Sequence, residues 1–501
     1  MLRSSHFLFS SFLVSVIFFS CTEYSSRQNP FEVYLYAEDD SYTYELAHRI
    51  EGDGYQAYVL RMVSQEWLTP DLVDETEWWH WLTIIYPDEA EHTTGLLWLG
   101  GGSRNSELPT EVDPMSLQVA LATGSVTAHL HNVPFQPLSF SGDDRLDQRY
   151  EDDLIAFGWR QFLESGATDE NAVWLSRFPM TKAAMRAMDT ITQFSLDHLE
   201  KDVTHFVVSG ASKRGWTTWT TAIFDDRVVA IAPVVIDVLN LIPSFEHHWQ
   251  AYGEWSPAIQ EYEDEKIMDW QYSLEYQRLL ELVDPFSYLD RLEIPKYIIN
   301  AASDEFFLPD SWKFYWEDLP GVKAIRYVPN AGHSMEGSDA AVSLAAFHNH
   351  ILLNRDLPQF EWNVNGNRVD LQLDPEQLPD ELRIWSAVNR EARDFRLYVI
   401  DRIWASQTVP FSISRDEQEV SVNEIQFTGG HIQLSGNGSL SVTMDAGEGY
   451  KAWFVEGIFG QDSTIPIKLT TGVVVTPDTY PFDPFVSQNP QGTQVTAIRN
   501  Q

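Results

Sequence analysis

Residues 206–216 read Phe-Val-Val-Ser-Gly-Ala-Ser-Lys-Arg-Gly-Trp and give the clearest indication of the fold. The apolar run predicts a strand, the small residues predict a tight turn, and the residues after Ser212 predict a helix. This order lifts a serine hydroxyl clear of a sheet, as in the nucleophile elbow of α/β-hydrolases. The usual elbow is Gly-x-Ser-x-Gly, whereas here Arg214 stands two positions after Ser212 and the glycine follows at Gly215.

A nucleophilic serine requires a base and an acid that orients the base, and in this fold both follow the serine, the acid first. Asp304 and His333 each come directly after an apolar stretch that is predicted to be a strand. We therefore predict a catalytic triad of Ser212, Asp304 and His333. Asp237, which also follows a predicted strand, is an alternative acid.

The oxyanion of an acyl-transfer intermediate requires backbone N–H donors. In this fold one donor is the residue after the nucleophile, here Lys213, and another comes from a loop after an earlier strand. A glycine run at 100–102 follows the predicted strand 95–99, and glycines allow close approach of the backbone to a substrate. We predict Gly101 or Gly102 as the second donor. The glycine motifs of nucleotide-binding loops are absent from the sequence, so no cofactor is predicted.

Three further residues are predicted to bind substrate. Arg214 either binds a substrate carboxylate, which favours peptides or acidic esters, or forms a buried ion pair that braces the elbow. His248 lies in an aromatic stretch that suits a cap over the site, at about 240–290. Trp216, in the predicted helix after Ser212, is placed in the same site.

No metal site is predicted. His129 and His131 would point to the same face of a strand, but no third ligand at metal-binding spacing accompanies them. Cys21 is the only cysteine, which excludes an intramolecular disulfide and a cysteine-based zinc site.

Composition excludes several protein classes. The chain has 501 residues, 44% of them hydrophobic, which is typical of a folded globular protein rather than a disordered or fibrous one. Its 33 basic and 74 acidic side chains give a net charge of -41, which repels phosphate backbones and anionic lipids, so nucleic acid is not expected as a partner. The acidity fits solubility in a salty or extracellular setting, or a cationic substrate.

The first 21 residues resemble an export signal. Arg3 precedes an apolar run at 7–19, which is shorter than the ~20 residues that span a bilayer, and a small residue and Cys21 follow. Cys21 is the candidate lipidation site if the signal is of the lipoprotein type; otherwise the protein is simply secreted. We expect a periplasmic protein, an outer-membrane-anchored lipoprotein or an extracellular protein, with membrane contact only through a lipid anchor.

The rest of the chain predicts two domains. After a polar linker at 22–30, apolar runs alternate with amphipathic segments over 31–360, which indicates an α/β-hydrolase domain with a doubly wound, mostly parallel sheet. Residues 361–501 predict a β-sandwich domain, because short alternating stretches are separated by turns such as 365–366 and 437–438. The stretches 382–385, 396–400, 452–457 and 467–475 are its candidate strands, and this domain is a candidate surface for a protein partner.

Several motifs resemble one family. The string 210–219, Gly-Ala-Ser-Lys-Arg-Gly-Trp-Thr-Thr-Trp, is similar to the signature of the PhoPQ-activated pathogenicity-related proteins, which are exported, α/β-hydrolase-like bacterial proteins. Further matching pieces lie at 79–81, 133–137, 236–240, 304–307, 330–333 and 469–472. Arginine two positions after the serine is the rule in that family, so the resemblance removes the objection that Arg214 raises.

Two functions follow from these predictions. The first is an exported serine hydrolase that cleaves an ester or amide bond, preferably in a peptide, through Ser212, Asp304 and His333. The second is an inactive α/β-hydrolase-like protein that binds or signals in the envelope or outside the cell. It is motivated by the resemblance, since the family has no settled substrate and a distant eukaryotic relative is a secreted growth-restraining signal.

Overall fold

The computed structural model of this chain describes residues 28–145, 147–374, 377–409, 412–414, 419–421, 425–427, 430–434, 439–445, 447–463 and 465–495. The predicted signal segment with Cys21, most of the predicted linker and the predicted turn at 437–438 lie outside these ranges. None of the described helices is long and apolar enough to cross a membrane.

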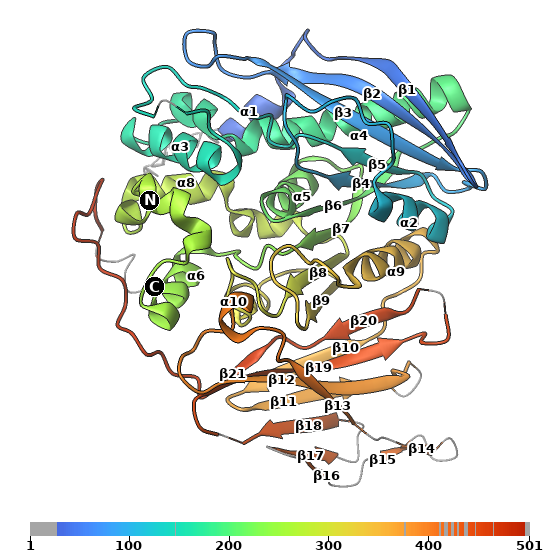
Figure 1. The fold of residues 1–501 in the computed structure, drawn as a ribbon, viewed down its shortest axis with the longest axis vertical. Helices are drawn as coiled ribbons and strands as arrows, with labels where there is room; N and C mark the ends of the chain where they lie inside the picture. Colours follow the sequence, from blue (N-terminus) through green and yellow to red (C-terminus); the bar gives the residue numbers. More distant parts are fainter. Residues whose placement is uncertain are drawn as a thin grey trace, which may run out of the picture.

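A nine-stranded sheet forms the centre of the fold (Figure 1). Its order is β1-β2-β3-β5-β4-β6-β7-β8-β9. The strands from β1 to β3 pair antiparallel, and those from β5 to β9 in this order run parallel. The chain is thus mixed α/β with a mostly parallel sheet, as predicted. The strands are β1 (Thr43–Gly52), β2 (Tyr55–Glu66), β3 (Glu77–Pro87), β4 (Thr94–Leu99), β5 (Thr127–Leu130), β6 (His205–Ala211), β7 (Val228–Val234), β8 (Lys296–Ala301) and β9 (Lys323–Val328).

Helices cover both faces of this sheet. The α-helices are α1 (Pro30–Tyr36), α2 (Pro114–Thr123), α3 (Glu151–Glu164), α4 (Arg177–Leu199), α5 (Lys213–Phe224), α6 (Leu241–Tyr252), α7 (Gln260–Asp264), α8 (Leu274–Val283), α9 (Ala340–Leu352) and α10 (Leu397–Ile400). The 3-10 helices are η1 (Asp169–Trp174), η2 (Pro257–Ile259), η3 (Ile267–Trp270), η4 (Pro285–Arg291) and η5 (Ser311–Phe314).

Adjacent residues of the parallel strands point into two separate cores. Val207 of β6 packs in the cluster that includes α2 and α9, whereas Val208 packs in the cluster that includes α4 and α5. A strand buried on both faces requires a continuous apolar run, which is why the parallel strands could be predicted as such runs. The carboxyl ends of these strands meet at one edge of the sheet, where the predicted triad residues follow β6, β8 and β9.

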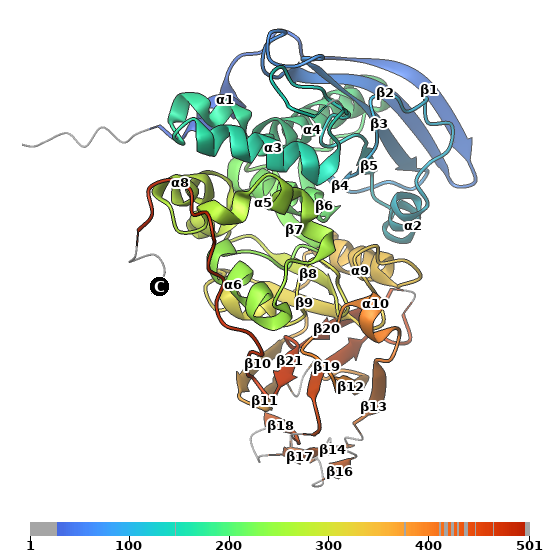
Figure 2. The same cartoon turned by 60° about the vertical axis from the view of Figure 1, so that its left-hand side comes forward.

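The segment between β7 and β8 forms helices α6, α7 and α8 with three 3-10 helices, over the region predicted as a cap. In Figure 2 the last part of the chain runs along the outer side of this segment. Phe485 packs against Trp249 and Trp255, and the amide of Leu274 donates a 3.0 Å hydrogen bond to the carbonyl of Thr493. The C-terminal tail is therefore attached to the cap helices.

The C-terminal region is β-rich. Its described strands are β10 (Phe360–Asn365), β11 (Arg368–Leu373), β12 (Glu381–Asn389), β13 (Ala405–Thr408), β14 (Ser412–Ser414), β15 (Glu419–Ser421), β16 (Ile425–Phe427), β17 (Gly430–Leu434), β18 (Ser439–Met444), β19 (Tyr450–Phe459), β20 (Ile467–Thr470) and β21 (Val474–Thr476). They form the antiparallel sheets β10-β11-β18-β17-β16 and β13-β12-β19-β20, with β21 beside β19 and a separate β14-β15 pair. One apolar cluster contains residues of β11 and β18 as well as of β12 and β19.

Two strand predictions in this region need correction. The stretch 396–400 is not a strand but contains the short helix α10, whose first amide, at Leu397, donates to the carbonyl of Ser303. A run of five residues is too short for alternation to distinguish a strand from a helical turn. The stretch 467–475 is interrupted between β20 and β21, where Gly472 lies against the ring of Trp312.

Candidate active site

Ser212 occupies a strained turn between β6 and α5. Its φ is 59° and its ψ is -125°, in a region that residues with a side chain rarely adopt. A Cβ on Gly210 would lie 2.9 Å from that of Arg214, and one on Gly215 would lie 2.9 Å from Ile236. Glycine is therefore required three positions after Ser212, not two, which explains in steric terms why this elbow tolerates Arg214.

His333 and Asp304 form a hydrogen-bonded pair. Nδ1 of His333 lies 2.9 Å from each carboxylate oxygen of Asp304, and the Asp304 side chain is almost fully buried. The amides of Phe306 and Phe307 donate to Asp304 Oδ1, and Glu305 Oε2 accepts a 2.7 Å hydrogen bond from the amide of His333. The loop after β8 therefore fixes both the carboxylate and the backbone that carries the imidazole.

The reactive side of the imidazole is free. Nε2 of His333 is buried and has no hydrogen-bond partner among the described residues, so no hydrogen bond joins it to Ser212. The ring of Phe306 lies 4.0 Å from that of His333, and Phe306 and Phe307 line the same pocket as Ser212. In this conformation, Phe306 and Phe307 thus contact the imidazole of His333 and also line the pocket that contains Ser212.

Asp237, the alternative acid, is bonded elsewhere. The hydroxyl groups of Tyr315 and Tyr327 donate to its two carboxylate oxygens. Burial raises the pKa of Asp237 to about 7, although the two tyrosine hydrogen bonds act in the opposite direction. The acid that contacts His333 is therefore Asp304, and Asp237 lies in the wall of the Ser212 pocket.

The glycine loop after β4 lies beside the elbow. The carbonyls of Gly101 and Gly102 accept hydrogen bonds of 2.8 Å from the amide of Asn132 and from Gln136 Nε2, respectively. In the described part of the chain the amides of both glycines donate to no protein group. Lys213 is the first residue of α5, where an amide has no acceptor within its own helix. The three predicted oxyanion donors are thus unengaged.

Arg214 is held by an ion pair. Its guanidinium contacts Glu151 and donates to the carbonyl of Val133, and Lys213 Nζ lies 2.8 Å from both Glu151 and Asp152. Burial alone would raise the pKa of Glu151, but Arg214 and Lys213 outweigh it and lower that pKa to about 2. Of the two roles considered for Arg214, the structure contains the bracing ion pair.

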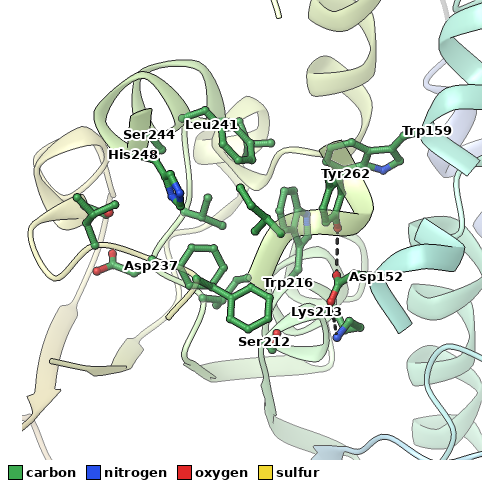
Figure 3. Close-up of a pocket in the computed structure, with 18 of the residues that line it drawn as sticks. Asp152, Trp159, Ser212, Lys213, Trp216, Asp237, Leu241, Ser244, His248 and Tyr262 are labelled. Atoms are coloured by element: carbon green, nitrogen blue, oxygen red, sulfur yellow. Dashed lines mark hydrogen bonds and ion pairs between the residues drawn. The ribbon is translucent and has the colours of Figure 1, made fainter. Parts of the chain in front are cut away.

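A mostly aromatic and aliphatic pocket opens above Ser212 (Figure 3). Trp216 and His248, both predicted to bind substrate, line it, together with the cap residues Leu241 and Tyr262. Nε2 of His248 accepts a 3.0 Å hydrogen bond from the amide of Ser256, and burial lowers the pKa of His248 to about 3. His248 is therefore a neutral wall residue rather than a proton donor at neutral pH.

His129 and His131, which were considered as metal ligands, are not among the residues that line the Ser212 pocket. The rings of His129 and His131 stack 3.8 Å apart behind the glycine loop. Within the described residues no group of three or more His, Cys, Asp or Glu side chains is placed to hold a metal.

Sequence reasoning did not identify several residues of the site, namely Glu151, Asp152, Arg177, Tyr262, Glu305, Phe306 and Phe307. Glu305 to Phe307 directly follow the predicted acid and lie in the string 304–307, whose resemblance to the family could have identified them. Glu151, Asp152, Arg177 and Tyr262 are distant in sequence from Ser212, and no motif marked them.

Solved structures resembling this one include acetyl xylan esterase 1 from Thermoanaerobacterium sp. JW/SL YS485, with 14% identity and a TM-score of 0.45 over 64% of this chain and 92% of that chain. Another is the acylaminoacyl peptidase of Pyrococcus horikoshii, with 14% identity and a TM-score of 0.37 over 66% of this chain and 52% of that chain. The activities in these names are those of the two enzymes.

Sequence comparison gives a closer relationship. Autocrine proliferation repressor protein A of Dictyostelium discoideum is 35% identical over 474 residues, which are 90% of this chain and 91% of that protein. The sequence model of the PhoPQ-activated pathogenicity-related protein family matches residues 31–396. The match runs from α1 to the residue before α10 and includes every predicted triad and oxyanion residue. The chain belongs to the PhoPQ-activated pathogenicity-related protein family.

Proposed function

We propose that this protein is a serine hydrolase that cleaves an ester or amide bond, with peptides as the preferred amides. The observation that carries the proposal is the strained conformation of Ser212, φ 59° and ψ -125°, at the start of α5. Strain of this kind persists where the surrounding structure enforces it and is common at active sites. The His333–Asp304 pair and the unengaged amides of the glycine loop support it.

In the proposed reaction, Ser212 Oγ attacks the substrate carbonyl carbon while His333 Nε2 takes the hydroxyl proton. The amides of Lys213 and of Gly101 or Gly102 bind the oxyanion, and His333 returns the proton to the leaving alcohol or amine. Asp304 accepts a hydrogen bond from Nδ1–H of His333, which fixes the tautomer and stabilises the imidazolium. Water then attacks the acyl-serine ester by the same route and releases the acid. Catalytic hydrogen bonds are often long in free enzymes, so closing the Ser212–His333 contact is a step that substrate completes.

Labelling with a fluorophosphonate probe tests the activated serine. Wild-type protein is expected to gain one adduct by intact mass, and Ser212→Ala and His333→Ala are expected to gain none. Ser244→Ala is the matched control, because Ser244 lines the same pocket but donates its hydroxyl to the Leu239 carbonyl. An adduct that survives in Ser212→Ala, or none on folded wild-type protein, would contradict the proposal.

The second candidate function is binding or signalling without turnover. The absence of a hydrogen bond between Ser212 and His333 in the described residues favours it, as does the name of the Dictyostelium relative, a proliferation repressor. In that case Ser212→Ala protein would retain full biological activity. The two candidates are thus separated by one variant.

We further propose that the protein is exported and that residues 1–21 are its signal. The apolar run 7–19 and Cys21 support this. Mass spectrometry of the mature protein made in its own cells distinguishes three outcomes: a lipid-bearing Cys21 at the N-terminus, a cleaved chain without lipid, or the intact 501-residue chain, which would contradict export by this signal.

A further inference from the structure

Arg177 is a buried cation beside the candidate nucleophile. It is the first residue of α4, its side chain is 1% exposed, and it lines the Ser212 pocket. Its Nη1 donates a 2.8 Å hydrogen bond to the carbonyl of Lys213, the residue after Ser212. Its guanidinium carbon lies 4.4 Å from the centre of the Trp216 ring. The positive charge is therefore held within one residue of Ser212.

This guanidinium has no carboxylate partner. Its Nε is buried and makes no hydrogen bond, and no Asp or Glu in the described ranges forms an ion pair with it. Tyr262 hydrogen-bonds this guanidinium, but a buried cation without a carboxylate is costly, and structural arginines are ordinarily paired with one. Burial lowers the pKa of Arg177 below its ordinary value, and Tyr262 and Asp152 offset this only in part. Arginine nevertheless stays protonated.

The nearby acids are already engaged. Glu151 pairs with both Lys213 and Arg214, and Asp152 pairs with Lys213 and accepts a 3.1 Å hydrogen bond from Tyr262, as the dashed lines of Figure 3 indicate for Asp152. Glu261 also interacts with Lys213, so three carboxylates accompany the three cations of this wall, but only Lys213 and Arg214 form ion pairs with them in the described part of the chain. A buried guanidinium that lines the pocket with its Nε unpartnered and no ion pair points to an anionic ligand.

The rest of the pocket narrows the ligand class. Its walls are mainly apolar, with Trp159, Trp216, Leu241 and Phe245 among them. A polyanion would make few contacts with these apolar walls. A carboxylate on a short apolar body would pair with Arg177 through its charge and pack against the apolar side chains through its body. The fork of an arginine matches a carboxylate in two parallel hydrogen bonds.

We propose that Arg177 binds a carboxylate of the substrate next to Ser212, so that the pocket selects esters and amides that carry a carboxylate close to the scissile carbonyl. This inference rests on the proposed hydrolase function. It gives Arg177 the role that the sequence offered to Arg214, which Glu151 occupies instead.

Two esters of similar length test the selection, p-nitrophenyl hemisuccinate and p-nitrophenyl valerate, at about 0.15 M salt or above to screen the net negative charge. Arg177→Met is expected to lower kcat/KM for the hemisuccinate by about 30-fold relative to the valerate, because a charge-assisted contact is lost. Arg177→Lys should restore part of the difference. An equal loss for both esters would overturn the proposal and leave Arg177 a structural role.

Arg186→Met is the matched control. Arg186 lies on the same helix, and its guanidinium carbon is 4.6 Å from the centre of the Tyr42 ring, but it pairs with Asp189 and is not among the pocket residues. Its replacement should leave the ratio of the two esters unchanged.

A binding measurement separates this inference from the hydrolase proposal. If wild-type protein cleaves neither ester, calorimetric titration of glutarate into Ser212→Ala protein still reports on Arg177. Binding that is at least about 10-fold weaker in the Ser212→Ala/Arg177→Met double variant supports the carboxylate site. Failure of glutarate to bind Ser212→Ala protein, or equal binding to both proteins, contradicts it.

Discussion

Ser212 lies between two flanks that are held by different parts of the chain. On one flank, ion pairs from α3 to the elbow fix Lys213 and Arg214 through Glu151. On the other flank, hydrogen bonds from the C-terminal region and an ion pair between Arg393 and Asp310 hold the loops after β8 and β9, which carry the Asp304–His333 pair. The elbow is thus fixed by a charge at the start of α3, whereas the loops that carry Asp304 and His333 are held by a part of the chain that follows them.

The histidine flank is attached to this later region at Ser303 and at Asn330, whose carbonyl accepts a 2.5 Å hydrogen bond from Arg402 Nη1. Nε1 of Trp404 donates a 2.9 Å hydrogen bond to Ser303 Oγ, and the amide of Leu397 donates a 3.0 Å hydrogen bond to the Ser303 carbonyl. Asn330, three residues before His333, exchanges two hydrogen bonds of 2.9 Å with the backbone of Trp404. The C-terminal region therefore supports the loops that carry the candidate base.

The largest effect is expected from Asp304→Asn, which breaks the histidine flank at its centre. The amide cannot hold the imidazole with a proton on Nδ1, so kcat/KM for a p-nitrophenyl ester should fall about 10⁴-fold while the unfolding midpoint changes little. Steady-state kinetics with a urea titration measures both. Asp237→Asn is the control, since Asp237 bonds to Tyr315 and Tyr327 rather than His333. If Asp237→Asn proves the more damaging change, the acid has been misassigned.

An intermediate effect is expected from Glu151→Gln, which removes the shared partner of the cationic flank. The side chain is 38% exposed, so the loss should be about 2 kcal/mol rather than the larger value of a fully buried pair, with activity reduced about 30-fold as the elbow shifts. Urea unfolding and ester kinetics measure the two. Glu164→Gln, on the same helix but in an exposed pair with Arg160, should change neither.

This contribution has a defined pH dependence. Because the folded pKa of Glu151 is lowered to about 2, below its ordinary value of 4.5, its stabilisation is fully present above pH 4.5 and is lost as the pH falls toward 2. The stability difference between wild type and Glu151→Gln should therefore shrink in that window. A difference that stays constant from pH 7 to pH 3 would show that the carboxylate charge is not what stabilises the elbow.

The two flanks also differ in how far the sequence predicts them. Ser212, Asp304 and His333 were predicted because each follows an apolar strand, a signal that lies within a few residues of the side chain itself. Glu151 and Arg177 lie 61 and 35 residues before Ser212, and a side-chain contact across such separations produces no periodic pattern in the sequence. The sequence could not decide whether Arg214 binds substrate or braces the elbow, because its ion-pair partner Glu151 could not be identified from the sequence.

The parts of the fold that could be predicted are likewise those with a local pattern in the sequence, whereas the parts that depend on distant contacts could not be predicted. The parallel strands are buried on both faces and read as apolar runs, so they were predicted, but β1 is largely exposed along its length and was not. The stretch 396–400 became a helix because the β8 loop accepts its first amide, and that partner lies about 90 residues away. The support that Trp404 gives to the histidine loop is equally a product of tertiary contact.

The smallest effect is expected from Asn330→Gly, which removes the hydrogen bonds between the Asn330 side chain in the loop after β9 and the Trp404 backbone in the C-terminal region. Asn330 has a φ of 57°, a conformation that glycine adopts freely, so the substitution removes two hydrogen bonds without adding backbone strain. Stability should fall by about 1–3 kcal/mol, and kcat should fall about 10-fold as the His333 loop loosens. KM should change little, because Asn330 is not among the residues of the Ser212 pocket.

Asn354→Gly is the matched control, because Asn354 is an exposed asparagine with a φ of 47° at the end of α9. It should lose neither stability nor activity, which isolates the effect of the hydrogen bonds from that of glycine itself. If Asn330→Gly lowers stability but leaves kcat unchanged, the C-terminal region supports the fold without positioning the base. The position of His333 would then be set by the loop after β8, through the hydrogen bonds that His333 donates to Asp304 and Glu305.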